Sequence, residues 1–186
     1  MAATGIALSE PEISTPQASV VALTRQLDGL VTCLLTLEAD IYVARAAASV
    51  TGSIGEHVRH LLDHVAALVS ADPSRPLSYD HRERGTAIES DISAALRQAL
   101  RLKAALERWM SRALDDPLLV QSVVSASGDR VDGWSTLSRE VAFVLSHTIH
   151  HLASIALLLY IQGLVVPDRF GFAPTTPTLA PPSEDA

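Results

Sequence analysis

The sequence is short of cysteine, of aromatic residues and of positive charge, and each shortage argues against a class of protein. Cys33 is the one cysteine among 186 residues, so no internal disulfide can form and a reducing cytoplasm is expected. Aromatic residues make up 4 % of the chain, fewer than a β-sandwich core calls for. Basic residues number 14 against 21 acidic ones, and a net charge of −7 provides no field for holding a nucleic-acid backbone.

Apolar runs long enough to cross a membrane are also missing. The most apolar stretch covers only residues 152–166, whereas a spanning helix needs about 20 apolar residues. It also contains Gln162 and Gly163, and the N-terminus has neither the basic start nor the apolar run of a secretory signal. We therefore expect no membrane segment and interpret residues 152–166 as the most buried helix of a soluble core.

Small apolar residues are what the chain has in abundance. The hydrophobic fraction is 48 %, and Ala and Leu recur throughout, which favours helices packed on helices. Apolar positions repeat every three or four residues in four segments, predicted as helices over 18–48, 53–70, 86–113 and 135–163. The sequence predicts an all-α four-helix bundle over residues 18–172, with tails of little order at 1–17 and 173–186.

Local signals mark where several of these helices begin and end. Ser53 with Glu56, and Thr86 with Glu89, have the spacing of a capping box at a helix N-terminus. Gly163 is expected just past the end of the last helix. Residues 118–124 instead favour strands, and Ser127-Gly128-Asp129 is a turn signal, so a short β-hairpin is predicted before the last helix.

Six of the seven histidines fall in two clusters on two predicted helices. His57, His60 and His64 share one helical face, because successive residues turn by about 100°. His147 and His151 are one turn apart and can both reach one ion, whereas His150 should point elsewhere. A single histidine on an apolar helix is ordinarily a hydrogen-bonded core residue. A cluster of them in an apolar core is better explained by a metal ion that satisfies several rings at once.

The type of ligand limits the choice of metal ion but does not identify it. Neutral imidazoles with no cysteine nearby suit zinc or nickel, and iron or manganese stays open. Spacing supplies His147 and His151 from the last helix and one of the three histidines on the second helix. Three protein ligands would leave an open coordination position, which is typical of catalytic metal sites.

Two stretches resemble motifs of the DinB-like superfamily. Ser53-Ile54-Gly55-Glu56 followed by His60-Leu61-Leu62-Asp63 resembles its second-helix motif. His147-Thr148-Ile149-His150-His151, continuing to Gln162-Gly163, resembles its H-x-x-x-H motif on the last helix. The resemblance covers roughly residues 18–172. It implies an up-down-down-up four-helix bundle that binds a divalent metal, often zinc or nickel, through His60, His147 and His151. His64 is the next candidate on the second helix, and His57 is also available.

The resemblance also implies a range of functions. Some members resemble thiol transferases that use bacillithiol, mycothiol or glutathione, many have no assigned activity, and the superfamily forms homodimers. We expect a metal-dependent enzyme with a small-molecule substrate, first a thiol S-transferase and second a hydrolase, in a homodimer. The alternatives are a non-catalytic metal-binding, ligand-binding or dimerisation bundle, and a structural bundle with stacked core histidines.

Several polar residues could serve such a metal. Glu140 lies two helical turns before His147 on the same face, where it could orient a substrate or accept a proton. The alternative is that it complements the positive end of the helix dipole. Asp63 could accept a hydrogen bond from a ligating imidazole, or it could be a surface acid.

Four further candidates lie in one loop, at Tyr79, Asp80, Arg82 and Arg84. Their arginines could hold a substrate carboxylate, such as the end of a thiol peptide. A loop of the form Tyr-Asp-x-Arg-x-Arg-Gly-Thr is also found in a subset of DinB-like proteins. The alternative is a solvated charged connection in which Gly85 supplies the turn.

Overall fold

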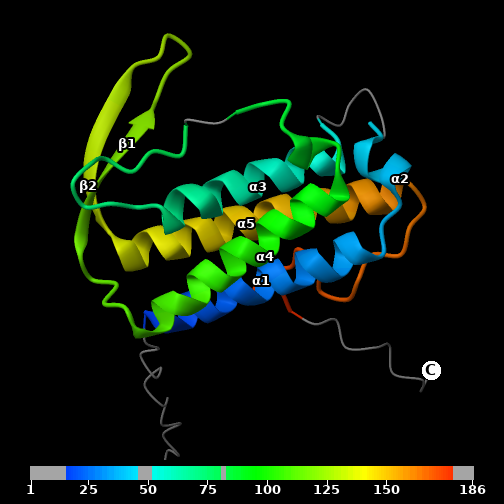
Figure 1. Cartoon of the computed structure of the whole chain (residues 1–186), viewed down its shortest axis with the longest axis horizontal. Coiled ribbons are helices and arrows are strands. Elements are labelled where there is room, and N and C mark those ends of the chain that lie inside the picture. Colours follow the sequence, from blue (N-terminus) through cyan, green and yellow to red (C-terminus); the bar gives the residue numbers. More distant parts are fainter. Residues whose placement is uncertain (1–15, 46–51, 81–82, 178–186) are drawn as a thin grey trace, which may run out of the picture.

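The computed structural model describes residues 16–45, 52–80 and 83–177, which are mostly helical with one small antiparallel sheet (Figure 1). The helices and strands have the following bounds: α1 Gln17–Leu35, α2 Ala39–Val43, α3 Ile54–Val69, α4 Ile92–Glu107, α5 Leu137–Ile161, β1 Pro117–Val123 and β2 Arg130–Thr136. Two short 3₁₀ helices, η1 Ala87–Glu89 and η2 Arg108–Ser111, stand before and after α4.

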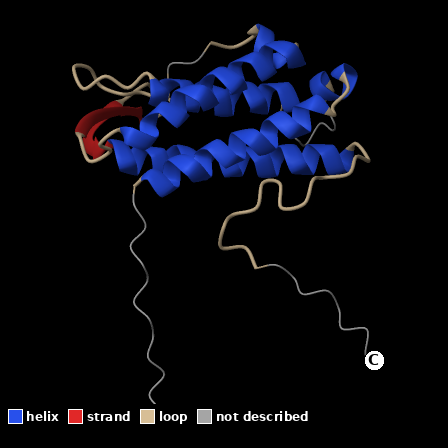
Figure 2. Cartoon of the chain, turned by 60° about the horizontal axis from the view of Figure 1, so that its bottom comes forward, coloured by secondary structure: helices blue, strands red, loops and turns tan. Residues whose placement is uncertain are grey.

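The long helices α1, α3, α4 and α5 share one apolar core. Helices α1 and α3 each pack against both α4 and α5, so side chains from all four enter the same interior. Leu27 of α1, Leu61 of α3, Leu102 of α4 and Ile155 of α5 are all buried there. Figure 2 shows these helices side by side, with the two strands at one end. The predicted helical periodicity is therefore confirmed as core packing.

The first predicted helix is broken in two. It was expected to run from 18 to 48, but α1 ends at Leu35, α2 covers only Ala39–Val43, and residues 46–48 lie outside the described part. The Thr36 hydroxyl donates to the Cys33 carbonyl at 2.9 Å, and Glu38 is extended. The bend allows Tyr42 to enter the core, where its hydroxyl donates to the Ile88 carbonyl at 2.6 Å. Tertiary packing of Tyr42 thus overrides the local helical pattern.

The second helix begins as predicted. In the capping box at Ser53, the hydroxyl accepts from the Glu56 amide at 3.2 Å, and the Glu56 carboxylate accepts from the Ser53 amide at 2.7 Å. Gly55 follows and is buried where η1 packs against α3. A Cβ added there would lie 2.0 Å from the carbonyl oxygen of Glu89, so the close approach of η1 requires glycine.

The predicted start of the third helix is wrong. Thr86 makes no side-chain capping bond, and residues 87–89 form only the 3₁₀ turn η1. The carboxylate of Glu89, expected to bond back to Thr86, instead pairs with Arg59 of α3 at 2.6 Å. Helix α4 starts at Ile92, where the Asp91 carboxylate accepts from the Ser93 amide at 2.8 Å. The α-helix ends at Glu107 and continues as η2 to Ser111, short of the expected 113.

The predicted hairpin and the last helix are confirmed. Strands β1 and β2 pair antiparallel from Pro117↔Thr136 to Val123↔Arg130, and the turn holds Gly128 at φ +90°. Thr136 then caps α5 by accepting from the Arg139 amide at 3.3 Å. Gly163, at φ +77°, ends α5 in a Schellman motif in which the Leu164 amide donates to the Leu159 carbonyl at 3.0 Å.

The predicted tails lie largely outside the described residues. The structure describes Pro16 and Gln17 of the expected 1–17 tail, and Gln17 already begins α1. Of the expected 173–186 tail it describes residues 173–177.

By length and composition alone, α1 and α5 could each cross a membrane. Both also contribute buried side chains to the shared core, as helices of water-soluble domains do. The interpretation of the 152–166 stretch as the most buried helix is wrong: α5 ends at Ile161, and Leu157, Tyr160 and Val165 are exposed, whereas Ile155, Leu158 and Leu159 are buried.

Candidate metal centre

Five of the seven histidines gather where α3 packs against α5. The members are His57, His60 and His64 of α3 and His147 and His151 of α5, and each of their rings has its centroid within 5.3 Å of another member. The exposed ring of His150 also lies 5.3 Å from that of His151 and is not counted in this group. We call these five residues the histidine cluster. The cluster forms because the α3 histidines recur at three and four residues and the α5 pair at four, so both sets face the shared interface.

Three members are arranged as ligands of one ion would be. The nitrogens that His60, His64 and His147 offer all lie within 4.8 Å of one another. The Nε2 atoms of His60 and His147 are 3.1 Å apart. Two nitrogens bound to one tetrahedral ion at about 2.0–2.1 Å lie about 3.3 Å apart, so this pair has nearly the required spacing.

The tautomer of His64 is set by its own helix. Its Nδ1 lies 3.0 Å from the carbonyl oxygen of His60. A carbonyl can only accept, so Nδ1 of His64 carries the proton and Nε2 keeps the lone pair in the neutral ring. This is the arrangement usual for a metal-ligating histidine, whose other nitrogen donates to a backbone carbonyl. The donor set therefore fits a divalent ion that prefers imidazole, as zinc and nickel do.

His151 lies beside this group and contacts it through its ring. Its centroid is 4.5 Å from that of His60 and 4.6 Å from that of His147, and its Nδ1 is 3.0 Å from Nδ1 of His57. Burial, with the neighbouring histidines, lowers the pKa of His151 to about 3. His151 is thus neutral at neutral pH, which is the form that binds a metal.

The predicted trio was His60, His147 and His151, with His64 next. The structure brings all four together, and the three whose nitrogens all lie within 4.8 Å of one another are His60, His64 and His147. His150 is exposed on α5, as expected.

Aromatic rings cover the end of the cluster that contains His64 and His147. The ring of Tyr79 stacks on His64 with a centroid distance of 5.3 Å, and that of Phe143 stacks on His147 at 6.0 Å. Neither aromatic ring was predicted as a cover for the metal. Phe143 is four residues before His147, and this helical spacing was the available signal.

Glu140 is buried, and its carboxylate is held by two hydroxyls. Tyr79 donates to Oε2 at 3.0 Å, and Ser135 donates to Oε1 at 2.6 Å. Burial and the adjacent carboxylate raise the pKa of Tyr79 far above its ordinary value, so the phenol stays a donor. The sequence placed Glu140 on the face of His147, and the structure connects it to the cluster through Tyr79 and the ring of His64.

The predicted loop residues separate into different roles. The carboxylate of Asp80 accepts from the Val123 amide at 2.8 Å, which ties the loop to β1. Arg82 lies outside the described residues. Arg84 is exposed and lines a pocket together with histidines of the cluster. Of the candidates in the described part of this loop, Tyr79 contacts the cluster through His64, and Arg84 lines the pocket beside it.

The pocket beside the cluster has a volume of about 400 Å³. It is lined by the following residues: Arg45, Gly52, Glu56, His57, Arg59, His60, Arg84, Glu89 and His151. Most of its charges are already paired: Arg45 with Glu56 at 2.5 Å and Arg59 with Glu89 at 2.6 Å. The pocket therefore leaves the His57 and His151 end of the cluster open to solvent.

Arg59 and Glu89 were not predicted as part of this site. Arg59 is buried and also donates to the Asp63 carboxylate at 2.7 Å. That bond gives Asp63 a partner on its own helix, and its predicted role beside an imidazole stays a prediction. The four-residue spacing of Arg59 and Asp63 was the sequence signal for this pair.

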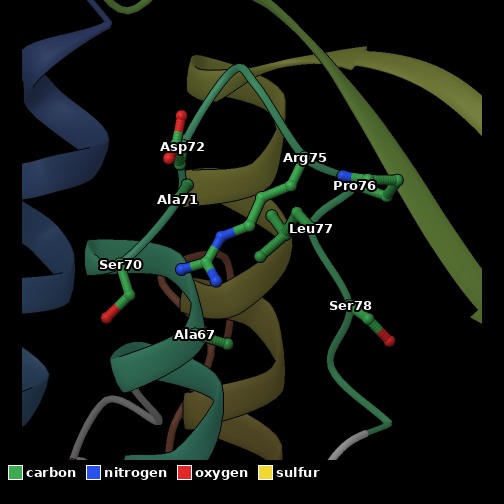
Figure 3. Close-up of a pocket in the computed structure, with 8 residues that line it drawn as sticks. All are labelled: Ala67, Ser70, Ala71, Asp72, Arg75, Pro76, Leu77 and Ser78. Atoms are coloured by element: carbon green, nitrogen blue, oxygen red, sulfur yellow. The ribbon is translucent and has the colours of Figure 1, made fainter.

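A second pocket, of about 190 Å³, lies at the other end of α3 (Figure 3). Figure 3 shows the guanidinium of Arg75 pointing toward the helix that carries Ala67 and Ser70. Histidine is missing from its lining, which holds Arg75 and Asp72 as charged groups, so it offers no metal-binding chemistry comparable to the cluster.

Comparison with known proteins leaves the family of this chain open. No protein-family model matches it, and no solved structure does so significantly. A protein named FK506-binding protein 5, from Rhizopus delemar, is 35 % identical over 101 residues. The match covers 54 % of this chain but only 26 % of that protein, so most of the protein that carries the name lies outside it.

Proposed function

We propose that this chain is a DinB-like, metal-dependent enzyme built on a four-helix bundle. The observation that carries the proposal is the histidine cluster, in which three imidazoles from two helices offer nitrogens within 4.8 Å of one another. The shared core of α1, α3, α4 and α5 supports the bundle, because α1 and α3 each pack against both α4 and α5. The order of the two histidine motifs along the chain supports the DinB-like assignment.

His60 and His147 belong to every ligand set that we consider. The third ligand is His151 by resemblance to the family motif and His64 by the nitrogen distances. The ion is zinc or nickel by ligand type, with iron or manganese as further candidates. With three protein ligands, such an ion lowers the pKa of a bound water or thiol and so supplies a nucleophile at neutral pH.

The residues around the cluster support a small polar substrate. Arg84 lies in the pocket beside His57 and His151 and can hold a carboxylate through its planar guanidinium. Tyr79 and Phe143 stack on His64 and His147 at the opposite end of the cluster. A thiol with carboxylate groups fits this combination, and we therefore propose thiol S-transfer before hydrolysis.

A non-catalytic role is the second candidate. The cluster contains five imidazoles, so a fourth histidine could close the coordination shell and leave a binding or sensing protein. In either case we propose a cytoplasmic homodimer, for which exposed apolar residues such as Leu157, Tyr160 and Val165 near the end of α5 provide a surface.

The experiment combines metal analysis with a thiol assay on protein that carries no histidine tag. We expect a stoichiometric divalent ion in the wild type, its loss in His147→Gln, and its retention in His150→Gln, the matched control on the same helix. Consumption of bacillithiol, mycothiol or glutathione with a chromogenic electrophile should fall at least tenfold in His147→Gln only. Metal without thiol turnover would favour the binding protein, and a wild type without metal would contradict the proposal.

A further inference from the structure

Two pairs of histidine nitrogens join α3 to α5, one helical turn apart. Nε2 of His60 lies 3.1 Å from Nε2 of His147, and Nδ1 of His57 lies 3.0 Å from Nδ1 of His151. We propose that the cluster holds two divalent metal ions, one at His60, His64 and His147 and a second at His57 and His151. This inference rests on the proposed function, because it extends the same cluster.

The first support is the number and spacing of the donors. A three-histidine site uses three of the five imidazoles and leaves His57 and His151, which already form a close pair. Their 3.0 Å separation is within a few tenths of an ångström of the about 3.3 Å expected for two ligands of one tetrahedral ion. The pair therefore repeats, one turn along, the geometry of His60 with His147.

The second support is the distance between the two positions. The ring of His151 lies 4.5 Å from that of His60 and 4.6 Å from that of His147, so the two ligand groups are in direct contact. Ions in two-metal enzyme sites are about 3.5–4 Å apart. The ring contacts therefore place the two proposed positions side by side, as a two-metal site requires.

The third support is the difference between the surroundings of the two positions. His64 and His147 lie under Tyr79 and Phe143, whereas His57 and His151 line the open pocket. Glu56 and Glu89 line the same pocket, but their carboxylates already pair with Arg45 and Arg59, so water would complete the coordination of an ion bound by two histidines. The outer ion is thus the one that a substrate would meet first.

The competing explanation of the His57–His151 contact is a hydrogen bond in which one neutral ring donates to the other. Metal stoichiometry separates the two. Untagged protein is freed of metal with a chelator, dialysed to equilibrium against increasing free zinc, and analysed for zinc per chain. We expect two ions per chain in the wild type, one in the double variant His57→Gln/His151→Gln, and two in the exposed control His150→Gln.

The number of zinc ions bound at saturation distinguishes the possible arrangements. A wild type that saturates at one ion overturns the second position and leaves the proposed function standing, whereas no bound zinc overturns both. Two ions in the double variant show that the second ion binds elsewhere and overturn the assignment to His57 and His151.

Because the double variant could fail to fold, ¹¹³Cd NMR of the wild type gives an independent measurement. Two cadmium resonances at saturation are expected, and a single resonance overturns the inference.

Discussion

Near the cluster, the surroundings of each polar side chain set its protonation state and its hydrogen bonds. The carbonyl of His60 keeps the proton of His64 on Nδ1, and burial keeps His151 neutral. Tyr79 and Ser135 satisfy the buried carboxylate of Glu140, which would otherwise be costly to desolvate. The residue types were visible in the sequence, but these partners are far apart in the chain.

The Tyr79–Glu140 bond makes a testable contribution to stability. In Tyr79→Phe the buried carboxylate loses one of its two hydroxyl donors, and we expect a loss of about 1–2 kcal/mol in the free energy of unfolding. Tyr160→Phe is the matched control, because Tyr160 is 74 % exposed and should change stability by less than about 0.5 kcal/mol. Urea titrations followed by circular dichroism measure both. Equal effects in the two variants would show that the bond does not stabilise the fold.

Cys33 should be chemically inert in the folded protein. Burial raises the pKa of its thiol to about 11 from an ordinary value of 9.0, which leaves about a hundredfold less thiolate at pH 8. We expect alkylation of the native protein by iodoacetamide at pH 8 to be at least about a hundredfold slower than alkylation in urea. Mass spectrometry at timed intervals gives both rates. Comparable rates would mean that Cys33 is accessible as a thiolate.

At the scale of the elements, the predictions that depend on neighbouring residues succeeded. The capping box at Ser53, the hairpin turn around Gly128 and the end of α5 at Gly163 are all formed within a few residues of chain. The failures are elements whose residues bond to distant partners. Glu89 pairs with Arg59 rather than with Thr86, and Tyr42 bends the chain after α1 to reach Ile88.

The two predicted capping boxes can be compared directly by mutation. Ser53→Ala removes the hydroxyl that accepts from the Glu56 amide, and we expect a loss of about 1 kcal/mol. Thr86→Ala is the control at a position with the same sequence signal, where no capping bond is formed, and the change should be within about 0.5 kcal/mol. Equilibrium unfolding in urea decides between them. A larger loss at Thr86 would contradict the structure of this turn.

The cluster depends on the fold of the whole molecule, because α3 and α5 are far apart in the sequence and are brought together by packing in the shared core. Their packing brings residues 57–64 against residues 147–151 and places the pocket at one end of the contact. This packing buries His64 and His151 and half-buries the other three rings, and a bound ion would add to the contacts that the rings already make with one another.

Removal of metal should therefore lower the melting temperature. An ion present at about a thousand times its Kd stabilises a fold by about 4 kcal/mol, which corresponds to about 10 °C for a domain of this size. We expect a chelator to lower the Tm of the wild type by this order and to leave that of His147→Gln unchanged. Differential scanning fluorimetry with and without chelator, followed by zinc addition, measures the effect. An unchanged wild-type Tm would indicate a structural cluster of stacked rings.

The sequence by itself determined the helical character, the two histidine motifs and the local caps and turns. These features depend on periodicity and on contacts within one turn or one hairpin, where few alternative structures compete. Only the tertiary structure decided which histidine nitrogens lie together, that His64 joins His60 and His147, and that Tyr79 links Glu140 to the cluster. Those relations depend on how α3 and α5 are rotated against each other, and the packing of the shared core sets that rotation.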